Sequence, residues 1–317
     1  MIARLSHGIT AALAPLTVGG AVLAYLYPPL FQPIGSVFLW LFGLTMFALG
    51  LVLQPAELGA TLRRPARIGA GVATQYSVMP LLGFAAAWLL PLSPEVALGF
   101  ILVASAPGAM ASNVLVYLAG GVVAYSIALT TVATLLAPLV TPTLVHWLGG
   151  VFVPVEFWPM VRTILFTVLL PLAGGMTLAR LAGPRVAPLR ALAPALAALA
   201  IILICAYAVS INHGRIADAG PWILLAVVLV NGLGYLAGWQ LARWYGFDAR
   251  HRLTLSIEIG MQNAGLGVAL ALAHFPPEAA LPGALFAVWS VITATGASAW
   301  LRRRGRGGGV AGPLAAG

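Results

Sequence analysis

The segment Ser256-Ile-Glu-Ile-Gly-Met-Gln-Asn-Ala-Gly-Leu-Gly267 decides the fold, because it places an acid, two amides and three glycines inside an otherwise apolar stretch. A second stretch is interrupted in the same way by Ala104-Ser-Ala-Pro-Gly-Ala-Met-Ala-Ser-Asn113. Pro and Gly weaken helices, and unwound backbone within a membrane survives only where it is buried in protein or lines a cavity. Asn113 and Asn263 are 150 positions apart in a chain of 317 residues, so the interruptions occupy corresponding places in two halves. Paired interrupted helices of this kind indicate a binding site near the middle of the membrane.

The composition predicts a membrane protein. Hydrophobic residues make up 61% of the chain and charged residues only 7%, whereas a soluble domain carries about 25% charged residues. A membrane span needs about 20 mostly apolar residues, and stretches of that length recur along the chain. The ten expected spans cover 9–27, 34–54, 67–90, 95–119, 122–148, 158–180, 188–211, 220–244, 251–274 and 281–301.

The arginines predict the orientation of the chain. All 16 basic residues are Arg, and they give a net charge of +9. With the N-terminus inside, only Arg162 and Arg215 fall on the outer side, which is the asymmetry expected of a multi-pass membrane protein. We therefore expect cytoplasmic N- and C-termini in the cell inner (plasma) membrane. Because the basic residues are spread over short loops between apolar spans, a nucleic-acid partner is not expected, and nothing requires an oligomer.

The two halves are expected to run in opposite directions. The fourth and ninth spans are five spans apart, an odd number, so the second half is inverted relative to the first. The sequence thus predicts an all-α polytopic protein with inverted repeats over about 9–148 and 158–301, in one transmembrane domain over 1–317. Residues 302–317 form a basic and then Gly/Ala-rich tail.

Glu258 is the centre of the expected site. Of the seven acids, it alone lies well within an expected span, where a charged side chain costs about 2.5–3.5 kcal/mol on insertion scales. No arginine lies in the middle of a span to neutralise it. One interpretation is a carboxylate neutralised by a bound cation; the other is a protonated, structural Glu that caps a broken helix.

Oxygen donors that suit a hard cation lie in neighbouring spans. They are Ser112, Asn113, Ser126, Thr130, Gln75 and Gln262. Ser126 and Thr130 are four positions apart and therefore share one face of a helix. Small hydroxyls also pack and hydrogen-bond helices in membranes, so each of them alone has a structural interpretation, and Gly234-x-x-x-Gly238 is better explained by close helix packing than by a site.

No arrangement of residues indicates an enzyme. The five histidines are scattered near the ends of the spans, without the spacing of a metal site. The single cysteine, Cys205, excludes an intramolecular disulfide and a cysteine metal cluster.

With these residues in place, the chain resembles the bile acid:sodium symporter family, most specifically at Ser256 to Leu266. Further similar segments are Met46 to Gly50, Pro107 to Ala119, Asn231 to Gly234, Gly246 to Asp248 and Leu281 to Trp289. The resemblance implies ten helices in two inverted five-helix repeats, with the unwound fourth and ninth helices crossing. A panel of helices one, two, six and seven would move against a core of the other six.

The resemblance also implies two sodium sites and a substrate surface. One sodium site would use Ser112, Asn113, Ser126, Thr130 and Glu258. The second would use Gln75, Glu258, Gln262 and the carbonyls of Ile259 and Met261. Substrate would contact Gly108, Met110, Asn263 and, at the position where the tenth span departs from the family pattern, Ser290.

The expected function is therefore sodium-coupled symport of an organic anion by alternating access. The chain has Ala109-Met110-Ala111 and Ser290-Val291 where many similar sequences carry polar groups, so the substrate pocket is expected to differ while the ion sites are retained. A small carboxylate such as pantoate is as compatible as a bile-acid-like molecule. The alternative is a proton-coupled carrier of organic anions in which Glu258 is the proton site.

Overall fold

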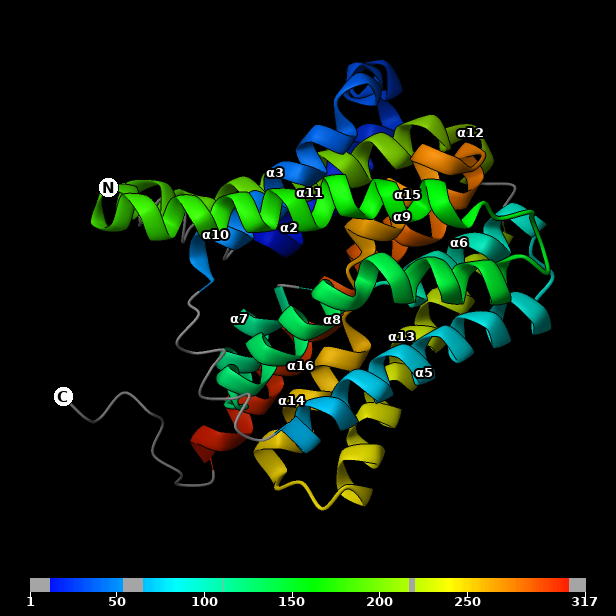
Figure 1. Ribbon diagram of the computed structural model, residues 1–317. Helices are drawn as coiled ribbons and strands as arrows, with labels where there is room; N and C mark the ends of the chain where they lie inside the picture. Colours follow the sequence, from blue (N-terminus) through cyan, green and yellow to red (C-terminus); the bar gives the residue numbers. More distant parts are fainter. Residues whose placement is uncertain (1–11, 54–64, 110, 217–219, 308–317) are drawn as a thin grey trace.

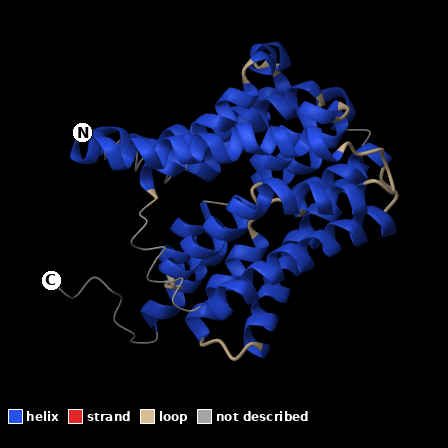
Figure 2. Ribbon diagram, in the orientation of Figure 1, coloured by secondary structure: helices blue, strands red, loops and turns tan. Residues whose placement is uncertain are grey.

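The computed structural model describes residues 12–53, 65–109, 111–216 and 220–307, and every regular element in these ranges is a helix (Figure 1). Figure 2 shows helices joined by short loops, with no strand among the described residues. The all-helical expectation is thus confirmed. Met110 and the tail from residue 308 onward lie outside the described residues, as do residues 217–219 and the expected span boundaries at 9 and 54.

Apart from the short α12 and the end of α16, the α-helices lie in the stretches expected from hydropathy or extend past their bounds by one or two residues. The first half contains α2 (Leu13–Leu26), the short turns η1 (Pro28–Leu30) and η2 (Gln32–Ser36), α3 (Phe38–Val52), α5 (Pro65–Leu89), α6 (Pro94–Ala104), α7 (Ala111–Ala119) and α8 (Val123–Leu144) with the π-turn η3 (Val145–Gly149). The second half contains α9 (Phe157–Ile164), the π-turn η4 (Leu165–Leu169), α10 (Leu170–Ala182), η5 (Gly183–Val186), α11 (Ala187–Ile211), α12 (His213–Ile216), α13 (Gly220–Trp244), α14 (Ala249–Gly260), α15 (Ala264–His274), η6 (Pro277–Ala280) and α16 (Leu281–Gly307).

Five helices of the described part are long and apolar enough by themselves to cross a membrane, or six if a bent pair counts as one span. The bent pair is Pro28–Ser36 with Phe38–Val52, which meet at 73°. The two broken spans are not among these helices, because each is divided into halves that are too short to cross a membrane alone. The halves are α6, α7, α14 and α15, with 9 to 12 residues each. The multi-span membrane character is therefore clear, and the ten-span inverted repeat remains our proposal.

The helices pack into two groups. In the upper group of Figure 1, α3 packs extensively against α10 and α11, and α11 also packs against α2. In the lower group, α13 packs against α5 and α14, while α16 packs against α7. These upper helices are among those that the family resemblance assigns to a panel.

A buried apolar cluster joins the two groups. It contains Phe42 and Met46 of α3, Ile204 of α11, Leu98 of α6 and Leu266 of α15, all of which are almost fully buried. A second cluster lies mainly within the lower group, around Phe100, Phe286 and Ile259. The helices α6 and α15, which flank the breaks, are thus packed among buried apolar side chains of the protein.

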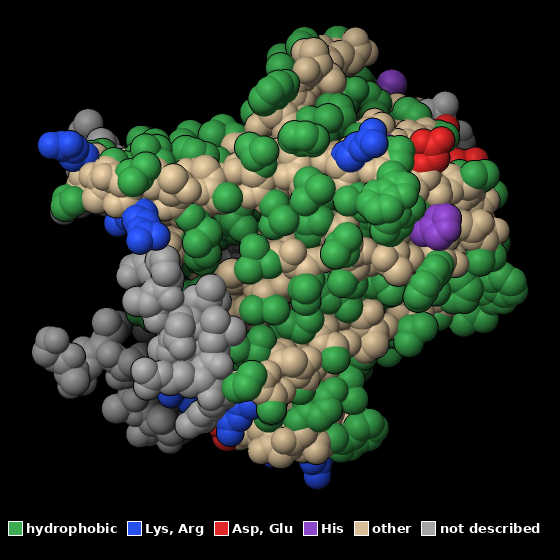
Figure 3. Space-filling model, viewed as in Figure 1, with side chains coloured by type: hydrophobic (Ala, Val, Ile, Leu, Met, Phe, Trp, Pro, Cys, Tyr) green, Lys and Arg blue, Asp and Glu red, His purple; other side chains and the backbone are tan. Residues whose placement is uncertain are grey.

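Charged side chains are few on the face drawn in Figure 3. Most Arg side chains are at the left and lower edges, another lies at the upper right beside the acids, and the middle of this face shows hydrophobic and other uncharged atoms. Helix sides that carry exposed Leu, Val and Trp without charges match a hydrocarbon solvent.

Two local features were not expected from the sequence. The spans 122–148 and 158–180 each contain a π-turn, at η3 and η4. In addition, α16 continues through Gly307, beyond the expected end at 301. Arg has a high helix propensity, so the basic segment extends the helix instead of ending it.

Candidate functional site

The two interrupted spans meet at their breaks. Gly108, between α6 and α7, forms an isolated antiparallel bridge with Gln262, between α14 and α15. The amide of Ala109 donates a hydrogen bond to the carbonyl of Met261 at 2.9 Å. Each break therefore satisfies unwound backbone of the other, as a membrane interior requires.

Helix caps explain where the two half-helices of the second broken span begin. Asp248 caps the N-terminus of α14 by accepting hydrogen bonds from the amides of Arg250 and His251, at 3.0 and 3.1 Å. The side chain of Asn263 caps α15 by accepting from the amide of Leu266 at 3.1 Å. At the first break, Pro107 cannot donate a backbone hydrogen bond, so α6 ends before it.

Glu258 lies on α14, is fully buried, and is surrounded by hydroxyls. Ser112 of α7 donates to Glu258 Oε1 at 2.5 Å, and Ser126 of α8 donates to the same oxygen. Thr130, one turn further along α8, donates to Glu258 Oε2 at 2.8 Å. The structure thus brings four of the expected site residues together from three helices.

The oxygens around Glu258 outnumber the hydrogens that join them. Ser112 Oγ is also 2.6 Å from the carbonyl of Ala109, and Ser126 Oγ is also 2.7 Å from Asn113 Oδ1. Each serine hydroxyl has a single hydrogen, so two hydrogens serve four contacts between oxygens. A cation, or a proton on Glu258, would supply the missing positive charge.

A second group of oxygens lies beside the first and includes the remaining expected ligands. Gln75 Nε2, on α5, donates to the carbonyl of Ala106 at 3.1 Å and to Gln262 Oε1 at 2.6 Å. Gln262 Nε2 donates in turn to the carbonyl of Ile259 at 2.7 Å. Gln75 Oε1 is buried and has no hydrogen-bond partner among the described residues. Burying an unsatisfied oxygen is unfavourable by about 1–3 kcal/mol, and a cation at this position would remove that penalty.

Gly108 allows the carboxylate to approach the first break. A Cβ at this position would lie 2.9 Å from Glu258 Oε2 and 3.7 Å from Thr130 Oγ1. Any side chain at position 108 would therefore displace the carboxylate.

The expected substrate residues are only partly brought together. Gly108 and Asn263 both lie at the paired breaks, where the side-chain oxygen of Asn263 is used as a helix cap. Ser290 is buried on α16, and its hydroxyl donates to the carbonyl of Ala287 in the same helix at 3.2 Å. Met110 lies outside the described residues.

Asn231 contacts the end of α14, and Thr293 contacts Asn231, although neither residue has a role expected from the sequence. Asn231, on α13, is almost fully buried, and its amide donates to the carbonyl of Gly260 at 2.8 Å. Thr293, on α16, donates to Asn231 Oδ1 at 3.0 Å. The available signal was a polar amide in the middle of the apolar stretch 220–244, within a segment noted only for its family resemblance.

Aromatic and charged residues join the N-terminal end of α5 to the N-terminal end of α14. Arg67 can only donate hydrogen bonds, so His251 Nε2, 3.4 Å away, is the acceptor and His251 Nδ1 donates to Asp248 at 2.6 Å. The guanidinium of Arg67 also lies 5.5 Å from the ring centre of Phe247. Hydrogen bonds from His251, first of all from its backbone amide, lower the pKa of the exposed Asp248 below its ordinary value.

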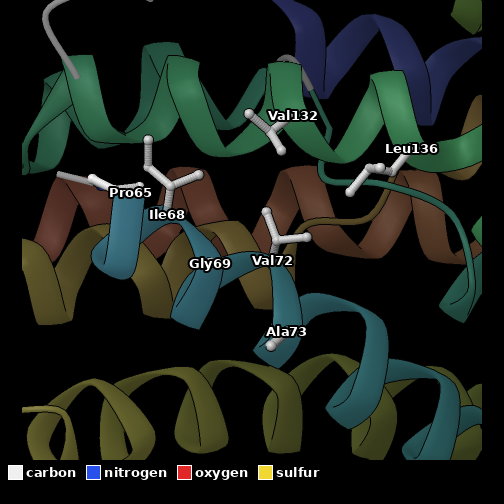
Figure 4. Close-up of a pocket in the computed structure, with 7 residues that line it drawn as sticks. All are labelled: Pro65, Ile68, Gly69, Val72, Ala73, Val132 and Leu136. Atoms are coloured by element: carbon white, nitrogen blue, oxygen red, sulfur yellow. The ribbon is translucent and has the colours of Figure 1, made fainter. Parts of the chain in front are cut away.

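The pocket drawn in Figure 4 lies between α5 and α8, and none of its side chains could bind an ion. In Figure 4, Ile68 and Val72 of α5 lie opposite Val132 and Leu136 of α8. Its lining is Pro65, Ile68, Gly69, Val72, Ala73, Val132 and Leu136. No lining side chain is polar, so the pocket suits hydrocarbon rather than a carboxylate or a cation.

Comparison with known proteins gives one consistent result. The pattern that defines the Sodium Bile acid symporter family matches residues 39–219. The uncharacterized sodium-dependent transporter YocS of Bacillus subtilis (strain 168) is 38% identical over 289 residues, which are 91% of this chain and 90% of that protein.

Plant proteins are also similar. The probable sodium/metabolite cotransporter BASS1, chloroplastic, of Arabidopsis thaliana is 36% identical over 261 residues, or 82% of this chain. The corresponding protein of Oryza sativa subsp. japonica is 35% identical over 261 residues. The matched part spans 65% and 63% of the length of these two relatives.

Proposed function

Because this chain belongs to the sodium bile acid symporter family, a family of sodium-dependent membrane transporters, we propose that it couples sodium entry to the uptake of a small organic anion. Transport would proceed by alternating access, with α2, α3, α9–α10 and α11 moving as a panel against the other helices. The plasma membrane is the proposed location, supported by the similarity to a bacterial transporter.

The observation that carries the proposal is the buried carboxylate at the paired breaks. Glu258 faces hydroxyls of Ser112, Ser126 and Thr130, and too few hydrogens are present for all the oxygen contacts. Hydroxyl, carboxylate and amide oxygens are ligands for a hard cation such as sodium. A sodium ion here would be ligated by these groups and by Asn113.

A second sodium ion would share Glu258 and bind the adjacent oxygens. The unsatisfied Gln75 Oε1, the side-chain oxygen of Gln262 and the carbonyls of Ile259 and Met261 form its proposed ligand set. Carbonyls at the C-terminal end of α14 carry the negative end of the helix dipole, which favours a cation on this side of the break.

The proposed substrate is a monoanion. Two sodium ions and one carboxylate sum to +1, and an uncompensated charge in the membrane is unfavourable. The N-termini of α7 and α15 begin directly after the two breaks, so their positive dipole ends favour an anion there. A small carboxylate of the pantoate kind and a bile-acid-like molecule both satisfy this charge requirement.

Glu258→Gln provides the first test. We expect the variant to fold, since an amide of similar size replaces the acid, and to lose the increase in Tm that sodium chloride gives the wild type relative to choline chloride. Glu95→Gln is the matched control, because Glu95 lies in the first turn of α6, away from the break at the other end of that helix. Sodium-driven uptake at the wild-type rate by Glu258→Gln would refute the assignment.

A proton-coupled carrier is the second candidate, because a proton on Glu258 would relieve the same shortage of hydrogens. The two functions separate when sodium is exchanged for choline at constant pH. Stabilisation and uptake that follow sodium support symport with sodium, whereas dependence on pH alone supports the proton carrier.

A further inference from the structure

We infer that Asn231 is a positioning residue of the second proposed sodium site, because it fixes the carbonyls at the end of α14. Its amide Nδ2 donates a hydrogen bond to the carbonyl of Gly260 at 2.8 Å. Gly260 stands between Ile259 and Met261, whose carbonyls are the proposed backbone ligands. The inference rests on the sodium site proposed above and adds a residue to which no role had been given.

The bond matters because the end of a helix leaves carbonyls without partners inside the helix. At the C-terminal end of α14 and at Met261, which follows it, three successive carbonyls each accept a hydrogen bond from a different donor. Ile259 accepts from Gln262 at 2.7 Å, Met261 accepts from Ala109 at 2.9 Å, and Gly260 accepts from Asn231. A peptide unit is planar, so holding the oxygen of Gly260 also fixes the peptide plane that joins it to Met261.

Asn231 is itself held in one orientation. Its Oδ1 accepts from Thr293 Oγ1 at 3.0 Å, and the hydroxyl of Tyr235 lies 3.4 Å from the same Thr293 oxygen. The amide therefore has partners at both ends and is 1% exposed. A rotated amide would bring its oxygen against the carbonyl oxygen of Gly260 and leave that carbonyl without a donor from Asn231, in a place that water does not reach, so the donor stays directed at Gly260.

Close packing keeps α13 against the break. A Cβ on Gly234 would lie 3.4 Å from the carbonyl oxygen of Ile259, and a Cβ on Gly260 would lie 2.4 Å from the Tyr235 ring. The Gly-x-x-x-Gly spacing of α13 thus marks close helix packing, as the sequence predicted, and it brings the Asn231 side chain within reach of the unwound backbone. Residues that hold metal ligands in place typically affect metal affinity about 10- to 100-fold when they are changed.

The experiment compares two buried asparagines that each hold a carbonyl. Asn231→Leu removes the bond to Gly260. The control, Asn212→Leu, removes bonds of Nδ2 to the carbonyls of Ala208 and Pro277, at 2.9 and 2.8 Å, away from the breaks. Thr293→Val leaves the bond to Gly260 in place and removes the contact of Asn231 Oδ1 with the Thr293 hydroxyl, together with the contacts of that hydroxyl to the carbonyls of Trp289 and Ser290 in its own helix. Each purified protein is titrated with sodium chloride against choline chloride at constant ionic strength, and Tm is recorded.

We expect both Leu variants to lower Tm without sodium, since each deletes a buried hydrogen bond. The sodium concentration that gives half of the stabilisation should rise about 10-fold in Asn231→Leu, rise less in Thr293→Val, and stay at the wild-type value in Asn212→Leu. A merely structural role would lower Tm and leave this concentration unchanged.

The outcomes separate this inference from the proposed function. A wild type whose Tm ignores sodium refutes the proposed function and the inference together. A wild type that responds, with Asn231→Leu responding at the same sodium concentration, refutes the inference alone. If Asn231→Leu does not fold, Thr293→Val decides: an unchanged half-saturating sodium concentration in that variant refutes the inference.

Discussion

At the scale of single residues, the site depends on a glycine, Gly108, as much as on its charged side chain, Glu258. Glu258 carries the charge, and the hydroxyls of Ser112, Ser126 and Thr130 face it. Gly108 provides the space, because its missing side chain lets the carboxylate lie against the first break. A carboxylate buried without partners would be very unfavourable, so these neighbours determine whether it can remain ionised.

Gly108→Ala tests this spatial argument. The added Cβ would lie 2.9 Å from Glu258 Oε2, the mobile end of a side chain, so the fold can adapt while the carboxylate moves. We expect the free energy of unfolding without sodium to change by less than about 1 kcal/mol, within the usual range for single substitutions. Sodium affinity should fall at least about 10-fold, or about 1.4 kcal/mol.

The control for this substitution is Gly69→Ala in α5, where a Cβ would meet no atom within 4 Å. That change should raise Tm slightly, because Ala is favoured over Gly in a helix by up to about 1 kcal/mol, and it should leave the sodium titration unchanged. A Gly108→Ala protein with wild-type sodium affinity would contradict the spatial argument.

At the scale of elements, the two breaks create the site by ending helices inside the protein. α14 has 12 residues and α15 has 11, so neither could span a membrane alone. Caps at Asp248 and Asn263 fix where each half-helix begins. The position of Glu258 along α14 is therefore set from the far end of that helix, by the cap at Asp248.

Replacing that cap should loosen α14. Loss of an N-cap acceptor costs about 0.5–2 kcal/mol, so Asp248→Ala should lower Tm at pH 7. Asp248→Asn should retain most of the stability, since Asn is also a good N-cap residue. Thermal unfolding in detergent would measure both, and equal losses in the two variants would contradict the role as a cap.

The pH dependence of this cap has a definite sign. The folded protein lowers the pKa of Asp248 below its ordinary value, chiefly through the amide of His251. Such a carboxylate contributes stability above its unfolded pKa of about 3.9, and the contribution is lost as pH falls through the lower, folded value. The difference in Tm between wild type and Asp248→Ala should accordingly shrink as pH falls below about 4.

At the scale of the whole molecule, apolar sides and charged ends define an axis through the membrane. Figure 3 shows most Arg side chains at the left and lower edges of the visible face, and the acids at the right with another Arg beside them. The upper and lower helix groups of Figure 1 share a buried apolar cluster, and each of the paired breaks adjoins a helix of the lower group, α7 or α14. A panel that slides on this junction is the motion we propose.

Cysteine labelling tests the orientation of the chain. On a Cys205→Ser background, Ala66→Cys and Pro184→Cys should react only from the cytoplasm, and Pro91→Cys only from outside. Ala66, Pro184 and Pro91 are exposed, and Pro184 is preferable to its neighbour Gly183, whose φ of 52° strains other residues. Reaction of Pro91→Cys and Pro184→Cys from the same side would refute the ten-span topology.

Charge movement tests the proposed stoichiometry. Because Glu258 stays with the protein, two sodium ions and one monoanion would carry a net +1 inward in each cycle. A negative-inside potential should then increase accumulation, by about 2.3 kcal/mol per charge per 100 mV. The measurement is uptake of a monocarboxylate into proteoliposomes at a fixed sodium gradient, with the potential set by potassium and valinomycin. Accumulation that ignores the potential would contradict the two-ion proposal.

The sequence by itself determined the helical membrane fold, the places of the two breaks and the central acid. These are local properties: an apolar stretch, a Pro-Gly pair and an isolated Glu258 can be recognised from neighbouring residues alone. The family resemblance added the remaining proposed ligands. The six side chains with oxygen donors that the sequence pointed to lie at the paired breaks or face them from α5 and α8. Their binding of sodium remains a prediction.

Only the tertiary structure decided which groups meet. Ser112 and Glu258 are 146 positions apart, and Gln75 and Gln262 are 187 apart. No sequence pattern predicts the hydrogen bond from Asn231 to the carbonyl of Gly260, or the hydrogen bond from Ser290 to the carbonyl of Ala287 in its own helix. The physical reason is that hydropathy and helix breaking act over a few neighbouring residues, whereas the direction of a hydrogen bond depends on how separate helices pack.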